Sequence, residues 1–203
     1  MFEIEYYRDA SGKKPVESFI DGLDLVMKPN TFGLVELLER YGPELGMPFS
    51  RHLEDGIFEF RVVRGSDSVR ILYFFVVGKR VVLTHGFRKK TQKARHAGKS
   101  KEPSRSARIG GREMNDFRRH LEASLKDPAF KEEWDVQAVE REVARSIVEA
   151  RMREGLTQQE LARRSGMMPA NLCRLENGNG NPSVATLSKI ASGLGCKLEI
   201  RFV

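Results

Sequence analysis

Residues 155–178, GLTQQELARRSGMMPANLCRLENG, constrain the fold more than any other stretch of this chain. Thr157, followed three residues later by Glu160, has the pattern of a capping box, which starts a helix by satisfying its first N–H groups. Gly166 supplies the positive φ that ends this helix, and Pro169 fits the first turn of the next one. The pattern predicts two short helices joined by a tight turn, an arrangement that can place its second helix in a DNA major groove.

Residues 155–195 resemble the lambda-repressor or XRE-type helix-turn-helix family. The phrases GLTQ-EL-A, RLENG and NPS-TL-IA-LG follow one another in family order and spacing. The resemblance implies a domain that binds operator DNA. A helical hairpin without any nucleic-acid role is the alternative.

The candidate DNA contacts lie near the starts of the two helices. Asn171 and Arg174 are expected on the exposed side of the second helix, where Asn can read adenine and Arg can read guanine. Asn171 could instead be an exposed helix-start residue without a contact. Gln158, at a helix N-terminus, can hold a phosphate. Met168-Pro169-Ala170 departs from the family, which usually has polar residues here, so the site read is undemanding or is read through DNA shape. The candidate set is Gln158, Gln159, Pro169, Ala170, Asn171 and Arg174.

The 203 residues suffice for two small domains, and the net charge of +7 is unevenly distributed. The first 113 residues hold 21 Lys and Arg against 15 Asp and Glu, whereas the rest hold 14 against 13. The basic excess therefore lies outside the predicted DNA-binding part. Two cysteines without metal spacing, no membrane-length apolar run and no signal peptide indicate a reducing cytoplasm. We expect no metal and no cofactor.

The first half of the chain has the pattern of an α+β domain. Phe2–Tyr7 alternates as a half-buried strand, and helices are expected after Pro15 and Pro29. Short connections join three further strands, so we expect an antiparallel sheet with two helices on one face. These strands are Ile57–Val63, Ser68–Val77 and Arg80–His85.

The two predicted hairpins fix a register. Turns about Gly65-Ser66 and Gly78-Lys79 would place Arg61 opposite Arg70, and Leu72 opposite His85. Two facing arginines repel each other unless an anion lies between them, so this face suits a phosphodiester backbone. The opposite face is expected to bury Phe58, Phe60, Val62, Val69, Ile71, Tyr73 and Phe75.

This half resembles the RelE/HigB superfamily of bacterial toxins, in its phage-derived branch. The phrases PVESFIDGL, LEDGIFEFRV, VRILYFF and LTHGFRKKTQK carry the resemblance and cover most of residues 1–93. It implies a metal-independent ribonuclease that acts on mRNA at the ribosome, through attack by the ribose 2′-OH. The further C-terminal helix of such toxins is missing here or unrecognisable.

That resemblance implies catalytic roles for a basic cluster. Arg61 and Arg70 would hold the scissile phosphate, Lys89 or Lys90 would assist, and His85 would carry a proton. The arginines could instead be solvated surface charges, His85 could be a packed ring, and the lysines could bind RNA non-specifically.

Residues 94–113 are rich in Lys, Arg, Ser and Gly and predict a flexible basic linker. Residues 114–138 then resemble an antitoxin start. Their aromatic residues either form a local core or dock on the toxin-like half, with acidic residues such as Glu132 and Asp135 facing Arg61 and Arg70. Residues 139–203 are expected to form a helix-turn-helix domain. We expect this helix-turn-helix domain to have five helices, followed by a terminal strand over Leu198, Ile200 and Phe202 that could pair across a homodimer.

Two functions follow from these resemblances. The first is an antitoxin-type repressor that binds its operator DNA and is fused to a toxin-like domain. The second is a ribosome-dependent mRNA endonuclease held inactive by the antitoxin-like half through an intramolecular or intermolecular toxin–antitoxin contact.

Overall fold

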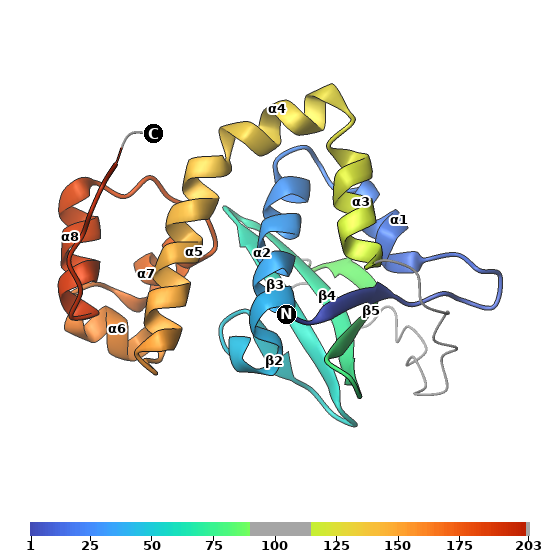
Figure 1. The fold of residues 1–203 in the computed structure, drawn as a ribbon, viewed down its shortest axis with the longest axis horizontal. Coiled ribbons are helices and arrows are strands. Elements are labelled where there is room, and N and C mark those ends of the chain that lie inside the picture. The colour runs from blue at the N-terminus through green and yellow to red at the C-terminus, as the bar shows by residue number, and fades with distance from the viewer. Residues whose placement is uncertain (90–114, 202–203) are drawn as a thin grey trace. The chain divides into compact units, whose positions relative to one another are not determined.

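The computed structural model describes residues 1–89 and 115–201 and divides the chain into two compact units, Met1–Val136 and Gln137–Val203. The first unit combines a sheet with helices, and the described part of the second contains helices only (Figure 1). The predicted class, an α+β domain followed by a helix-turn-helix domain, is confirmed. Lys90 and the predicted linker 94–113 lie outside the described residues.

A five-stranded sheet forms the centre of the first unit, in the order β1-β5-β4-β3-β2. The predicted strands are all present, and β2 adds a short edge strand. Strand β1 pairs parallel to β5, so the sheet is mixed rather than antiparallel as expected. No tight turn joins β1 to β5, and only a tight turn would have forced them to be antiparallel. The strands are β1 (Glu3–Tyr6), β2 (Ser50–His52), β3 (Ile57–Arg64), β4 (Asp67–Val76) and β5 (Arg80–Arg88).

The β3–β4 hairpin has the predicted register, with Arg61 opposite Arg70. The side chains expected on the inner face are buried or half-buried there, and Phe60 and Tyr73 are fully enclosed. The period-2 alternation therefore assigned the two faces of these strands correctly.

The β4–β5 hairpin departs from the prediction through a bulge. Leu72 does not pair with His85, because the register shifts by one residue at this point. The hydroxyl of Thr84 donates to the carbonyl oxygen of Leu72 at 3.0 Å, which satisfies a group at the interruption of the ladder. The flanking pairs are Ile71 with Gly86 and Tyr73 with Leu83.

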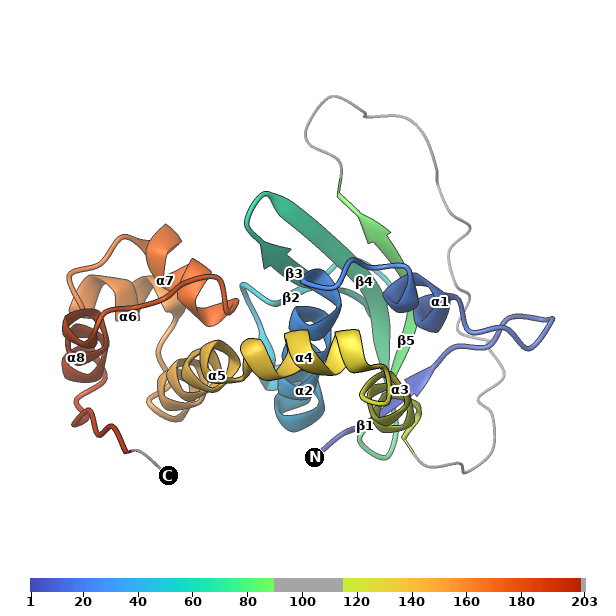
Figure 2. The same cartoon turned by 90° about the horizontal axis from the view of Figure 1, so that it is seen from above.

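Helices α1 (Pro15–Asp21) and α2 (Met27–Tyr41) cover one face of the sheet, and a short 3-10 turn, η1 (Gly42–Leu45), follows α2 (Figure 2). Gly86 allows α1 to approach β5 closely, because a Cβ at this position would collide with the Phe19 ring. This close contact fixes α1 against the part of β5 that follows the bulge.

Two helices from beyond the undescribed segment complete this layer. They are α3 (Asp116–Ser124) and α4 (Pro128–Val136). The rings of Phe117 and Phe130 both lie 5.7 Å from the ring of Phe32, and all three side chains are buried. The helical layer of the first unit therefore contains more than the two helices expected, and its aromatic core joins α2 to α3 and α4.

The second unit contains four helices in its described part: α5 (Ala138–Arg153), α6 (Gln158–Arg164), α7 (Pro169–Glu176) and α8 (Val184–Gly193). We expected five helices, but α4 belongs to the first unit. The predicted terminal strand is wrong over residues 196–201, which form no regular structure. Leu198 and Ile200 are exposed there, since a single strand has no ladder partner within this chain. No helix among the described residues is long and apolar enough to cross a membrane.

Candidate nucleic-acid interface

The helix-turn-helix consists of α6 and α7, drawn in orange in Figure 1. Thr157 caps α6 by accepting a hydrogen bond from the Glu160 N–H at 3.1 Å. The Glu160 carboxylate binds Arg163 and Arg164 at 2.7 and 3.0 Å. Hydrogen bonds from Arg163 and then Arg164 lower the pKa of Glu160 to about 2. Gly166 takes a φ of +63° in the turn, as the sequence predicted.

A small apolar core holds the four helices together. Gly193 lies so close to Ser165 that a side chain there would collide with it, which lets α8 pack tightly on the end of α6. The core side chains are Ile147, Leu161, Ala162, Leu172, Ile190 and Leu194. Leu172 is fully buried, so α7 is fixed by this side and the opposite side of α7 is left exposed.

A buried ion pair sets the orientation of α7 more specifically. Arg151 of α5 and Glu176 of α7 are 4% and 0% exposed, and their Nε–Oε1 and Nη2–Oε2 distances are 2.6 and 3.1 Å. Arg151 Nη1 also donates to the carbonyl oxygen of Leu156 at 3.0 Å. This bidentate geometry ties α5, α7 and the start of α6 together.

Gln158 belongs to the same cluster. Its amide nitrogen donates to Glu176 Oε2 at 3.0 Å, so it positions α7 in this structure, whereas we expected it to face a phosphate. The sequence reasoning missed the roles of Arg151 and Glu176. The sequence indicates this pair only through the position of the two residues on the inner faces of amphipathic helices, because buried charges are stable there only when they are paired.

The other candidate DNA contacts are accessible. Gln159, Pro169, Ala170, Asn171 and Arg174 are all exposed. Ala170, Asn171 and Arg174 lie on the side of α7 turned away from the buried Leu172, and Pro169 is exposed at the N-terminal end of the helix. A hollow of about 620 Å³ lies beside this side and is bounded by residues of α7, by the loop that follows it and by α8. Asn171, Arg174 and Lys189 line this hollow, which gives it both amide and cationic groups.

On the first unit, the two predicted catalytic arginines share an internal anion. Oε1 of Glu59 lies 2.7 Å from Arg61 Nε and 3.4 Å from Arg70 Nε. Arg70 is buried, and its Nη1 donates to the Val69 carbonyl oxygen at 3.0 Å. Burial lowers the pKa of Arg70, which the nearby Glu59 opposes. The repulsion foreseen between the facing arginines is therefore relieved by Glu59 and not by acidic residues of the 114–138 segment, where Asp135 pairs with Lys131 at 2.6 Å.

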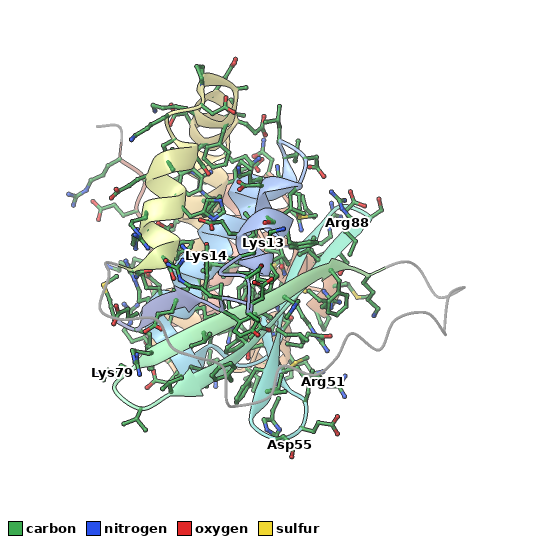
Figure 3. The ribbon with its side chains drawn as sticks, turned by 90° about the vertical axis from the view of Figure 1, so that its right-hand side faces the viewer. Lys13, Lys14, Arg51, Asp55, Lys79 and Arg88 are labelled. Carbon is green, nitrogen blue, oxygen red and sulfur yellow. The ribbon has the colours of Figure 1, made fainter. Side chains whose placement is uncertain are left out.

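The remaining predicted catalytic residues do not form a described cluster with the arginines. The ring of His85 is half-buried and packs against Tyr7, with 6.0 Å between centroids. Lys89 is exposed at the end of β5, and Lys90 lies outside the described residues. Figure 3 shows Lys79 and Arg88 near the two ends of β5 and Arg51 near the β2–β3 turn, so these basic side chains are spread over the unit.

Comparison with known proteins also separates the chain into two parts, one on each side of a segment that includes the boundary between the two structural units. Residues 18–101 match the family of phage-derived Gp49-like proteins (DUF891), and residues 147–200 match a helix-turn-helix family. A segment of 53 residues is 42% identical to the uncharacterized HTH-type transcriptional regulator y4dJ of Sinorhizobium fredii. This segment is 26% of the present chain and covers 69% of that relative.

Proposed function

Because the chain belongs to the HTH-type transcriptional regulators and has a Gp49-like domain at its front, we propose that it is an antitoxin-type repressor fused to a toxin-like domain. The observation that supports this function most is the outer side of α7. It presents Asn171 and Arg174, three positions apart, on a helix whose other side is locked by a buried ion pair. Such a helix can enter a major groove and read base edges.

Binding of the full chain to the DNA upstream of its own gene tests this function. We expect a protected site in footprinting, and we expect Asn171→Ala and Arg174→Ala each to weaken binding about 5- to 150-fold, equivalent to about 1–3 kcal/mol per contact. Arg145→Ala is the matched control, because it removes the same charge from α5, away from the outer side of α7. Variants that bind the site as tightly as the unchanged protein would exclude α7 as the reading helix.

Helix α3, from the antitoxin-like part of the chain, packs on the toxin-like sheet and helices, and this contact supports the fusion of the two parts. The Asp116 carboxylate accepts the backbone N–H of Tyr6 at 3.0 Å and the ammonium of Lys14 at 2.8 Å. Tyr6 lies on β1, an edge strand, so Asp116 satisfies a donor that would otherwise be open at the edge. Figure 3 shows Lys14 near the lower end of α3.

Further polar contacts join α3 and its N-cap residue to α1, α2 and β1, which precede the undescribed segment. Arg118 binds Glu39, which is buried on α2, and Asn115 donates to the same carboxylate at 2.7 Å. His120 lies between the Tyr6 hydroxyl at 3.1 Å and the Asp21 carboxylate at 3.0 Å. We propose that this surface is the toxin–antitoxin contact of the protein.

Arg118→Ala tests this contact. It would leave the buried Glu39 carboxylate with one fewer counter-charge, which costs about 2–5 kcal/mol. We expect the first unit to melt at a lower temperature, whereas Arg51→Ala, a control at an exposed arginine of β2, should change little. Equal melting temperatures for the two variants would show that the Arg118–Glu39 pair adds no stability to this contact.

Ribosome-dependent cleavage of mRNA is the second candidate function, favoured by the facing pair Arg61 and Arg70. Because Glu59 offsets part of the positive charge of this pair and Arg70 is buried, we expect the full chain to have little nuclease activity. Growth arrest on expression of the full chain, removed by Arg61→Ala, would support the enzyme instead. A homodimer and contacts with mRNA and the ribosome stay predictions.

A further inference from the structure

The start of α7 lacks the kind of cap that the neighbouring helices have. Thr157 caps α6 and Ser183 caps α8, each by accepting a backbone N–H with its side-chain oxygen, at 3.1 and 3.2 Å. At the same position of α7 stands Met168, whose side chain makes no cap hydrogen bond. Polar residues are strongly preferred at this position, so the methionine forgoes a stabilising contact.

The residues at this point are apolar and yet exposed. Met168 is 68% exposed, and Pro169 and Ala170 beside it are also exposed, whereas the preceding Met167 packs against the core of the unit. Burial in the second unit therefore does not account for Met168. A contact with a partner outside the unit would account for an exposed apolar tip.

The position of this tip indicates which partner it meets. It lies at the N-terminal end of the helix that presents Asn171 and Arg174, and Met168 and both polar residues line the same hollow. In a major groove, the thymine C5-methyl group is the base-edge feature that an apolar side chain recognises. The side chains of Met168, Pro169 and Ala170 carry no hydrogen-bond donor, so none of them can read a base edge by donating to it.

The low net charge of the DNA-binding unit indicates that base-edge contacts supply a large share of its affinity for DNA. The second unit, residues 137–203, carries 10 Lys and Arg against 7 Asp and Glu, so its net charge of +3 gives only a modest general attraction to phosphates. Discrimination then depends on base-edge contacts, both polar and apolar. This reasoning builds on the proposed function and extends it to the sequence class of the operator.

We propose that residues 168–170 are a thymine-methyl reader. The DNA site then has one or two thymines under the tip of α7, beside the base pairs that Asn171 and Arg174 read through adenine and guanine.

Replacement of thymine by uracil tests the proposal directly, because it removes the methyl group and leaves the hydrogen-bonding edge unchanged. The preferred site of the full chain is first selected from random duplexes, and each thymine in it is then replaced in turn. We expect an approximately fourfold loss of affinity for each methyl group contacted, the equivalent of about 0.8 kcal/mol. Thymines outside the footprint are the internal control.

Met168→Ser separates reading from folding. It supplies the missing cap, so we expect a higher melting temperature together with loss of the uracil effect at one thymine. A selected site that binds equally well with uracil throughout would overturn the methyl reader while leaving DNA binding intact. Failure to select any site would overturn both this inference and the proposed function.

Discussion

The buried pair Arg151–Glu176 offers the sharpest test of how the reading helix is held. In Arg151→Met, Glu176 would keep a fully buried carboxylate that has lost its bidentate cation and keeps the Gln158 amide at 3.0 Å. In Glu176→Leu, the buried guanidinium of Arg151 would lose its carboxylate partner and keep only the Leu156 carbonyl oxygen. Changing both residues removes the charges together and leaves apolar side chains of similar size.

The expected magnitude follows from burial. Breaking one side of a buried ion pair costs about 3–5 kcal/mol, whereas replacing both partners by apolar residues is often neutral. The second unit spans residues 137–203, and a domain of this size has a total stability of about 3–10 kcal/mol. Each single variant should therefore lose between about one third and all of the stability of this unit. The double variant should stay within about 2 kcal/mol of the unchanged protein, since the Leu156 carbonyl and Gln158 also lose a partner.

Urea unfolding can follow the two units separately. The single tryptophan, Trp134, lies on α4 in the first unit and stacks on Phe130, so its fluorescence reports that unit. Far-UV circular dichroism follows the helices of both units. We expect an early helical transition in the single variants with an unchanged tryptophan transition. A loss below about 1 kcal/mol in the single variants, or a double variant as unstable as the singles combined, would refute the role assigned to the pair.

Two further predictions concern the first unit. Burial alone would raise the pKa of Asp116, but hydrogen bonds from Lys14, the Tyr6 N–H and Arg119 outweigh it and leave the pKa below its usual value. Because its pKa is lower in the folded state, the ionised Asp116 stabilises the fold above its unfolded pKa of about 4. This contribution is lost as the pH falls through the folded-state pKa. Melting temperatures measured from pH 6 to pH 2 should show this decline, and Asp116→Asn should flatten it. Glu59→Gln removes the carboxylate that pairs with Arg61 and Arg70, so we expect tighter binding of single-stranded RNA. The slope of log binding constant against log salt concentration should become steeper by about 0.7 to 1.4. An unchanged slope would show that the arginine pair is not accessible to RNA.

Local chemistry explains which parts of the fold could be predicted. A short connection dictates the register of β3 and β4, so the facing of Arg61 and Arg70 followed from the position of the turn. The helix-turn-helix was predictable because Thr157, Gly166 and Pro169 each act on their own neighbours. The exposure of Asn171 and Arg174 followed from helical periodicity once Leu172 was assigned to the core.

Long-range pairing explains what the sequence did not predict. Nothing near β1 determines that it runs parallel to β5, and no local pattern in the sequence marks the bulge beside Leu72. The bridging position of Glu59 was missed although it was assigned to the correct face. Its carboxylate reaches one arginine along its own strand and another across the ladder, and the alternation pattern gives the face but not these contacts.

The position of α3 and α4 changes what separation of the two halves would mean. The Gp49-like match ends at residue 101 and the helix-turn-helix match begins at residue 147, so both helices lie between the families. Structurally they belong to the first unit, where Phe117 and Phe130 pack on Phe32. Loss of the chain from Gln137 onward would keep this aromatic core, whereas loss from Asn115 onward would expose Phe32 and remove the carboxylate that satisfies the edge of β1. The toxin-like fold therefore depends on helices that resemble an antitoxin start, and removing the whole antitoxin-like half would weaken that fold.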